Sequence, residues 1–140
     1  LLPVAAANAV VADHGPDELD IKSASQTRVA WEGPVEMDGA IWPVQNEHFV
    51  LIPAGKHRLS PGLHSAPVTI SDFNGDIQSA LTSENRVDLS YTSRGRALAT
   101  LGSPVSSIEV DGAPFWKAVP GSAENTITLP AGQHLVSFNR

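Results

Sequence analysis

The stretch Leu51-Ile52-Pro53-Ala54-Gly55-Lys56-His57 returns later in the chain as Thr128-Leu129-Pro130-Ala131-Gly132-Gln133-His134. Proline fixes φ early in a turn and glycine accepts the left-handed conformation, so each Pro-Ala-Gly segment is predicted to be a hairpin turn. After the turn, His57 shares one strand face with Leu59, and His134 shares one with Val136. The stretch therefore predicts two similar pairs of β-strands.

A second block of sequence is repeated in the same order. Val35-Glu36-Met37-Asp38-Gly39-Ala40 corresponds to Ile108-Glu109-Val110-Asp111-Gly112-Ala113. Apolar and acidic residues alternate with a period of two, which indicates a half-buried strand. Asp-Gly then predicts a tight turn, because glycine accepts positive φ and aspartate bonds its own backbone. The acids at positions 36, 38, 109 and 111 are expected on the solvated face.

A weaker match upstream completes an internal duplication, with Leu19-Asp20-Ile21 set against Val87-Asp88-Leu89. Three matching blocks in one order predict pseudo-repeats over residues 1–62 and 63–140. No stretch shows helical periodicity, and each unit alone would expose an apolar sheet face. We therefore expect one all-β domain over residues 1–140, a β-sandwich of roughly ten to fourteen antiparallel strands. Two small tandem lobes are the alternative.

Composition limits the classes of partner. The chain of 140 residues has a formal charge of −6 and only nine Lys and Arg residues, and these form no basic stripe. This argues against nucleic acid and against an anionic membrane surface. The chain contains no Cys, so disulfides and thiolate metal sites are excluded. No apolar run reaches membrane-spanning length, and the apolar start over residues 1–11 is predicted to be a first strand.

The histidines have two interpretations. His57 and His134 occupy equivalent places in the two units. The functional interpretation is that they are a pair of metal ligands or acid/base groups, and the structural interpretation is that they anchor the turns. A turn anchor bonds a backbone carbonyl, and its recurrence at the same turn favours this structural role. His14, His48 and His64 lie in predicted loops without metal-ligand spacing.

The segment Asp72-Phe73-Asn74-Gly75-Asp76 carries oxygen ligands at alternate positions, as calcium loops do. Asp72, Asn74 and Asp76 are therefore weak calcium candidates, and no other metal or cofactor is expected. The glycine comes too early for an EF-hand, and Asn74-Gly75 is also typical of a hairpin turn. We favour the turn.

Aromatic residues provide the candidate binding site. Ile41-Trp42 follows the first Asp-Gly turn and Phe115-Trp116 follows the second, so one residue of each pair should face outward. An outward tryptophan on a β scaffold can stack against a sugar ring. The predicted carbohydrate-binding residues are Trp42 and Trp116, with further contributions from Trp31, Tyr91 and His48. The alternative is that the tryptophans pack inside the sandwich or against a neighbouring domain.

The repeated strand and turn pattern, from Val110-Asp111-Gly112 to Leu129-Pro130-Ala131-Gly132-Gln133-His134, resembles PEGA-type surface β repeats of bacterial proteins. It is also similar to the C-terminal β-sandwich accessory domains of bacterial glycoside hydrolases. The motif covers about half of the chain. This resemblance implies a secreted or cell-surface location, a neighbouring catalytic domain, and polysaccharide or oligosaccharide as a ligand.

Three hypotheses follow. The first is a non-catalytic carbohydrate-binding or substrate-presenting module of a secreted glycoside hydrolase. The second is a purely structural or interaction domain that packs against a neighbouring catalytic domain. The third is an enzyme with an unrecognised site, although no catalytic residues are predicted and no Gly-x-Ser-x-Gly or phosphate-binding loop occurs. Exposed coplanar aromatics would favour the first, buried tryptophans the second and convergent carboxylates in a pocket the third.

Overall fold

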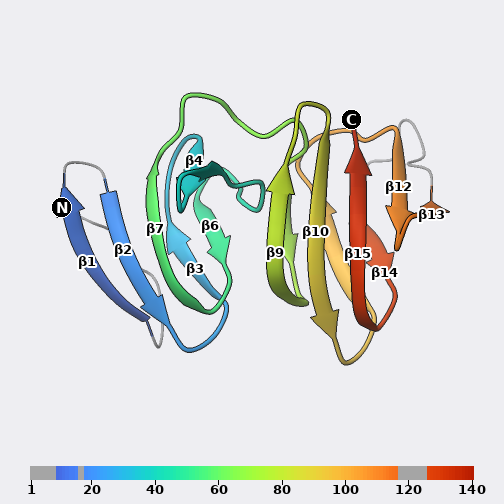
Figure 1. Ribbon diagram of the computed structural model, residues 1–140, viewed down its shortest axis with the longest axis horizontal. Coiled ribbons are helices and arrows are strands. Elements are labelled where there is room, and N and C mark those ends of the chain that lie inside the picture. The colour runs from blue at the N-terminus through green and yellow to red at the C-terminus, as the bar shows by residue number, and fades with distance from the viewer. Residues whose placement is uncertain (1–8, 16–17, 117–125) are drawn as a thin grey trace.

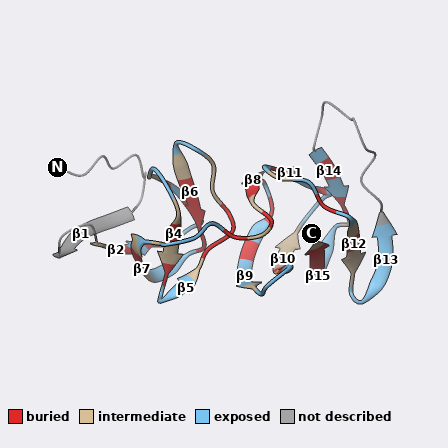
Figure 2. Ribbon diagram, turned by 90° about the horizontal axis from the view of Figure 1, so that it is seen from above, coloured by how far each residue is buried: buried red, intermediate tan, exposed pale blue. Residues whose placement is uncertain are grey.

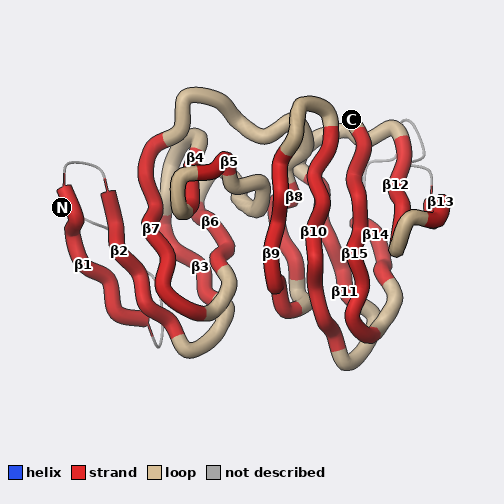
Figure 3. The backbone as a smooth tube through the Cα atoms, viewed as in Figure 1, coloured by secondary structure: helices blue, strands red, loops and turns tan. Residues whose placement is uncertain are grey.

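The computed structural model describes residues 9–15, 18–116 and 126–140, and in these ranges it is built of strands and loops alone (Figures 1 and 3). The strands of these ranges are β1 (Ala9–Gly15), β2 (Glu18–Ser23), β3 (Thr27–Ala30), β4 (Val35–Met37), β5 (Ala40–Ile41), β6 (Phe49–Ile52), β7 (Gly55–Pro61), β8 (Ile70–Phe73), β9 (Asp76–Thr82), β10 (Arg86–Ser93), β11 (Ala97–Leu101), β12 (Ser107–Val110), β13 (Ala113–Trp116), β14 (Thr126–Leu129) and β15 (Gly132–Asn139). The predicted all-β fold is confirmed. The predicted strand over residues 1–11 falls mostly outside the described residues, and β1 begins at Ala9.

The strands form the two layers of a sandwich (Figure 2). One layer holds two five-stranded sheets, with the orders β1-β2-β7-β4-β5 and β9-β10-β15-β12-β13, and the other holds β3-β6 and β8-β11-β14. All strand ladders are antiparallel. The first half of the molecule, β1 to β7, and the second half, β8 to β15, therefore have the same strand order in their large sheets. The duplication itself stays a prediction of the sequence.

The layer of short strands continues from one half to the other. Val44 forms a parallel bridge to Ile70, and Gln45 forms an antiparallel bridge to Val50, so the segment before β6 joins that strand to β8. The Ile70 amide donates to the Pro43 carbonyl at 2.9 Å. One cluster of buried residues consequently runs through both halves.

Polar side chains connect the halves at the same joint. The Gln26 amide group donates to the Gly75 carbonyl at 2.7 Å and accepts from the Ile77 amide at 2.6 Å. Arg28 Nη2 lies 2.9 Å from Asp72 Oδ1, and the Arg28 guanidinium lies 4.8 Å from the centre of the Phe49 ring. The first half contributes side chains here and the second half contributes mainly backbone, so the joint does not follow the repeat.

Alternation of apolar residues explains the strands and the core. In β10, Val87, Leu89 and Tyr91 are fully buried, while the residues between them are part-exposed. In β2, Leu19 and Ile21 point inward in the same way. A period of two sends one set of side chains into the sandwich and the other set to solvent.

The two Asp-Gly turns are tight hairpins, as predicted. Asp38 and Asp111 both have φ of 53°, and the glycines after them have φ of 85° and 83°. The flanking residues pair directly, Met37 with Ala40 and Val110 with Ala113. Positive φ at both central residues is the geometry of a type I′ turn, which matches the twist of the strands.

The Pro-Ala-Gly segments are not hairpin turns, and that prediction is wrong. β6 and β7 belong to different layers, as do β14 and β15, so each segment is a corner between layers. Asn74-Gly75 is also a corner of this kind, between β8 and β9. Turn residues specify a reversal of the chain, whereas the choice of pairing partner depends on the rest of the sheet. Positive φ at Gly55 (111°) and Gly132 (98°) agrees with the expectation for the turn itself.

The register corrects the upstream alignment of the two units by two residues. Leu19 pairs with Leu59, and Leu89 pairs with Val136. Leu59 and Val136 each lie two residues after the repeated histidine, so Leu19 corresponds to Leu89 and not to Val87. A shift of two residues preserves the alternating pattern, which is why the sequence alone suggested the wrong match.

We predict that Gly55→Ala and Gly132→Ala each lower the free energy of unfolding by about 1–2 kcal/mol, because an L side chain is strained at positive φ. Gly95→Ala is the matched control, since nothing lies within 4 Å of its added methyl group and its φ is not positive. Chemical denaturation measures all three. Equal stability of the corner variants and the control would contradict the strained corner geometry.

Candidate functional site

Two histidine–aspartate contacts recur at equivalent places, and we call each one a clamp. In the first clamp, His57 Nδ1 lies 2.7 Å from Asp38 Oδ2, and His57 Nε2 lies 3.1 Å from the Ala54 carbonyl oxygen. Asp38 Oδ1 also accepts the Arg58 amide at 2.8 Å. The clamp thus ties the Asp-Gly hairpin to the layer corner and to the start of β7.

The second clamp has the same partners in the second half. His134 Nδ1 lies 2.6 Å from Asp111 Oδ2, and His134 Nε2 lies 2.7 Å from the Ala131 carbonyl oxygen. Asp111 Oδ1 accepts the Leu135 amide at 2.9 Å. The interpretation of the histidines as turn anchors that bond a backbone carbonyl is confirmed. Their aspartate partners were not predicted from the sequence, although Asp-Gly and Pro-Ala-Gly-x-His recur together.

Both ring nitrogens of each histidine face an acceptor, a carboxylate and a carbonyl. The doubly protonated ring donates to both acceptors, whereas a neutral ring donates to only one. Hydrogen bonds to the Asp111 carboxylate and to the Ala131 carbonyl raise the pKa of His134 above its ordinary 6.5. The Leu135 amide and His134 lower the pKa of Asp111 below its ordinary 3.8. Charge-assisted hydrogen bonding therefore stabilises the second clamp.

The clamps do not have the geometry of a catalytic histidine. The first clamp borders a hollow that also contains Ser60, so the residue types of a Ser-His-Asp triad are close together. In such a triad, Nε2 takes a proton from the nucleophile. Here Nε2 of His57 is directed to the Ala54 carbonyl oxygen and not to the Ser60 hydroxyl. A carbonyl oxygen can only accept a hydrogen bond, so this contact does not prepare Nε2 to take a proton. The clamp is suited to holding backbone in place.

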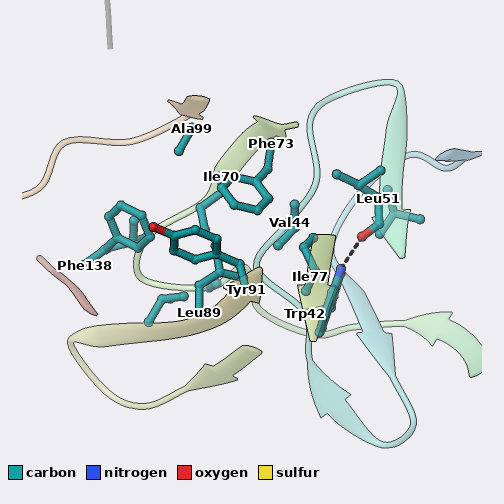
Figure 4. Close-up of a cluster of buried hydrophobic side chains, with 14 of the residues drawn as sticks. Trp42, Val44, Leu51, Ile70, Phe73, Ile77, Leu89, Tyr91, Ala99 and Phe138 are labelled. Atoms are coloured by element: carbon teal, nitrogen blue, oxygen red, sulfur yellow. Dashed lines mark hydrogen bonds between the residues drawn. The ribbon is translucent and has the colours of Figure 1, made fainter. Parts of the chain in front are cut away.

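Trp42 and Tyr91 are buried, so neither lies on the surface where a sugar ring could stack. Trp42 is 4% exposed, and its indole N–H donates to the Leu51 carbonyl at 2.8 Å (Figure 4). Figure 4 shows its ring beside Val44 and Ile77, at the joint of the two halves. Tyr91 is fully buried and donates to the Pro130 carbonyl at 2.8 Å, and burial raises its pKa to about 12. The joint, which the sequence did not reveal, covers Trp42.

The remaining aromatic candidates differ in exposure. Trp31 is half-buried, and its backbone amide donates to the carbonyl of His48, whose side chain is exposed. These two predicted residues therefore lie together. In the second half, Phe115 is 42% exposed. The backbone of Trp116 pairs with Ile108, and its side chain lies outside the described residues.

A polar hollow of about 660 Å³ lies beside His48. It is lined by turn and loop residues of both halves, among them Gln45, Glu47 and Thr69. We call it the linker hollow, because Ser65 of the segment between β7 and β8 also borders it. The polar side chains in its lining suit hydrogen bonds to a hydroxyl-rich ligand.

The calcium candidates are engaged in protein contacts. Asp72 Oδ1 accepts from Arg28 and from the Phe73 amide, and Asn74 Oδ1 accepts from the Leu98 amide at 2.7 Å. Asp76 is exposed. Throughout the described ranges, no three His, Asp or Glu side chains are grouped as metal ligands. The contacts of Asp72 and Asn74 hold the corner between β8 and β9 in place.

A second hollow, of about 750 Å³, lies over the outer face of β2 and β7. We call it the sheet hollow. Charged side chains of both signs line it, and Asp20 and Arg58 pair across it at 2.8 Å. The residues that line it are Glu18, Asp20, Ile21, Lys22, Asp38, Gly39, Lys56, His57, Arg58 and Ser60.

Comparison of the chain with known protein families, with characterised proteins and with solved structures found no match. In the described part of the chain, no helix has the length and apolar character needed to cross a membrane.

We predict that the second clamp makes stability depend on pH. Because the pKa of His134 is raised, the stability that its protonated ring contributes is fully present below pH 6.5 and is lost as pH rises through the raised pKa. Because the pKa of Asp111 is lowered, the stability that its carboxylate contributes is fully present above pH 3.8 and is lost as pH falls through the lowered pKa. His134→Gln should therefore lower the melting temperature relative to the parent protein. This decrease should be largest between about pH 4 and 6 and should become smaller above about pH 7. Thr92→Ala, a neighbouring change without a titrating group, should give a difference that does not vary with pH. A pH-independent deficit in His134→Gln would contradict the charged clamp.

Proposed function

We propose that this chain is a non-catalytic structural or interaction domain that packs against a neighbouring domain. The burial of Trp42 is the observation that carries the proposal. A tryptophan that was expected as a sugar platform instead fills the joint between the halves, where its N–H bonds to the Leu51 carbonyl. Its large apolar surface thus contributes to the packing between the halves.

Exposed apolar side chains offer surfaces for such packing. Leu63 and Leu81 are 89% and 70% exposed, far more than the core leucines. Leu98, Phe115 and Leu135 are each exposed by more than two fifths. Apolar groups of this kind are stabilised when a neighbouring surface removes them from water. The proposed neighbour is the catalytic domain of a secreted bacterial glycoside hydrolase, which the resemblance of the turn motifs supports.

Carbohydrate binding is the second candidate function. The observation in its favour is that half-buried Trp31 is hydrogen-bonded through its backbone to His48, which lines the linker hollow together with several polar side chains. A partly exposed indole edge with nearby amide and carboxylate groups can bind a sugar by stacking and hydrogen bonds. In this candidate, polysaccharide or oligosaccharide binds at the end of the sandwich and not at Trp42.

We predict that Trp42→Ala lowers the free energy of unfolding by about 3–5 kcal/mol, because it leaves a cavity at the joint. Trp31→Ala, the matched control at a half-buried site, should cost less than half of that. Denaturation curves and a broad glycan screen of all three proteins test both functions. Glycan binding by the parent protein that Trp31→Ala abolishes without unfolding would establish the second candidate and contradict a purely structural role.

The neighbour is tested in a longer polypeptide that carries these residues together with a flanking domain. Hydroxyl-radical labelling of Leu63, Leu81, Leu98, Phe115 and Leu135 should fall for at least one of them relative to the isolated chain. Removal of residues 1–140 should lower the melting temperature of the flanking domain. Unchanged labelling and independent melting would contradict the packing proposal.

A further inference from the structure

Two lysines face each other across the sheet hollow. Lys22 of β2 and Lys56 of β7 are direct partners in the strand register, and both side chains are exposed. Cross-strand partners on one face lie about 5 Å apart at Cβ, so the two ammonium groups reach the same space. Like charges in this position repel each other and destabilise the sheet.

No acid of the described chain neutralises this pair. The nearest acid along β2 is Asp20, which is paired with Arg58 at 2.8 Å. Asp38 is bonded to His57 and to the Arg58 amide. None of the ion pairs formed within the described residues includes Lys22 or Lys56. The repulsion is left for solvent or for a ligand to relieve.

The second half of the molecule shows that the fold does not need these lysines. The equivalent cross-strand pair is Thr92 with Gln133, which precedes His134 as Lys56 precedes His57. The second clamp and its strand pairing form with that neutral pair in place. Protection of a sheet edge does not explain the lysines either, because β2 and β7 are both interior strands of their sheet.

The other end of the sheet hollow carries acceptors. Glu18 and Ser60 lie two strand positions beyond the Asp20–Arg58 pair, and the half-exposed Asp38 carboxylate lies at the side. A polyanion lying along the strands would meet these carboxylates and be repelled. A ligand with a single carboxylate and several hydroxyl groups would instead place its carboxylate at the lysines. Its hydroxyl groups would then lie at the acceptors.

We propose that the sheet hollow is a binding site for a sugar acid, a glycan residue of the uronic acid type. The carboxylate binds between Lys22 and Lys56, and the ring hydroxyls donate to the acidic groups of the hollow. The site is separate from the linker hollow, and it operates whether or not the domain packs against a neighbour. Charge-assisted hydrogen bonds to an ammonium pair supply the affinity, which is modest because the hollow is open.

The experiment is an NMR titration of the whole chain at low ionic strength with galacturonic acid, and with galactose as the neutral comparison. We expect saturable shifts of the amides around Lys22 and Lys56 with the acidic sugar alone, with a dissociation constant on the order of millimolar. The double variant Lys22→Gln/Lys56→Gln should bind about ten-fold more weakly or worse. It should remain folded, because the second half forms the same strand pair with neutral residues.

The matched control is Arg94→Gln/Arg96→Gln, which removes the same charge from an exposed turn of the second half and should leave binding unchanged. Equal weakening in both double variants would show an effect of net charge and would overturn the site. Inorganic sulfate that shifts the same amides with the same affinity would show a bare anion site and overturn the sugar acid. No shift with any probe would overturn the proposal, while leaving the packing proposal and the linker hollow untouched.

Discussion

The clamp between histidine and aspartate is the contact on which the architecture of each half depends. It joins a type I′ hairpin, a corner between the two layers and the first residues of β7 or β15. These two strands are the central strands of their five-stranded sheets. The position of the central strand determines how the sheet faces the other layer, so a short polar contact at the edge of the core organises the apolar packing behind it.

The clamp also limits what the histidines can do. The two ring nitrogens of each imidazole lie against a carboxylate oxygen and a backbone carbonyl oxygen, and neither is directed at a nucleophile. Repetition of the clamp in both halves follows from its structural task, since each half has the same corner to secure. Features that differ between the halves are therefore better indicators of function than features that repeat. The lysine pair of the sheet hollow and the aromatic environment of Trp31 are two such differences.

The joint between the halves shows how the two halves pack together. The segment from Pro43 to Gln45 adds backbone pairing between β6 and β8, and Trp42 fills the space behind it. Gln26 completes the joint by bonding both a carbonyl and an amide of the opposite half. The contacts that cross from one half to the other, Val44 with Ile70 and Gln26 with Gly75 and Ile77, join residues that are far apart in the chain. Burial of Trp42 at this joint makes its ring part of the core and not of the surface.

The sequence by itself determined the local structure. Alternation in Val87, Leu89 and Tyr91 predicted their inward face, and Asp-Gly predicted two tight hairpins, because these depend on neighbouring residues and on backbone sterics alone. Recurrence of the Pro-Ala-Gly-x-His motif likewise indicated an anchoring role for His57 and His134. The tertiary structure decided which strands pair, and so turned the predicted Pro-Ala-Gly hairpins into corners between layers. It also decided that Trp42 is covered, that Asp38 and Asp111 hold the histidines, and that Lys22 meets Lys56. These are contacts between residues far apart in the chain, and only the closed sandwich, which minimises exposed apolar surface, brings them together.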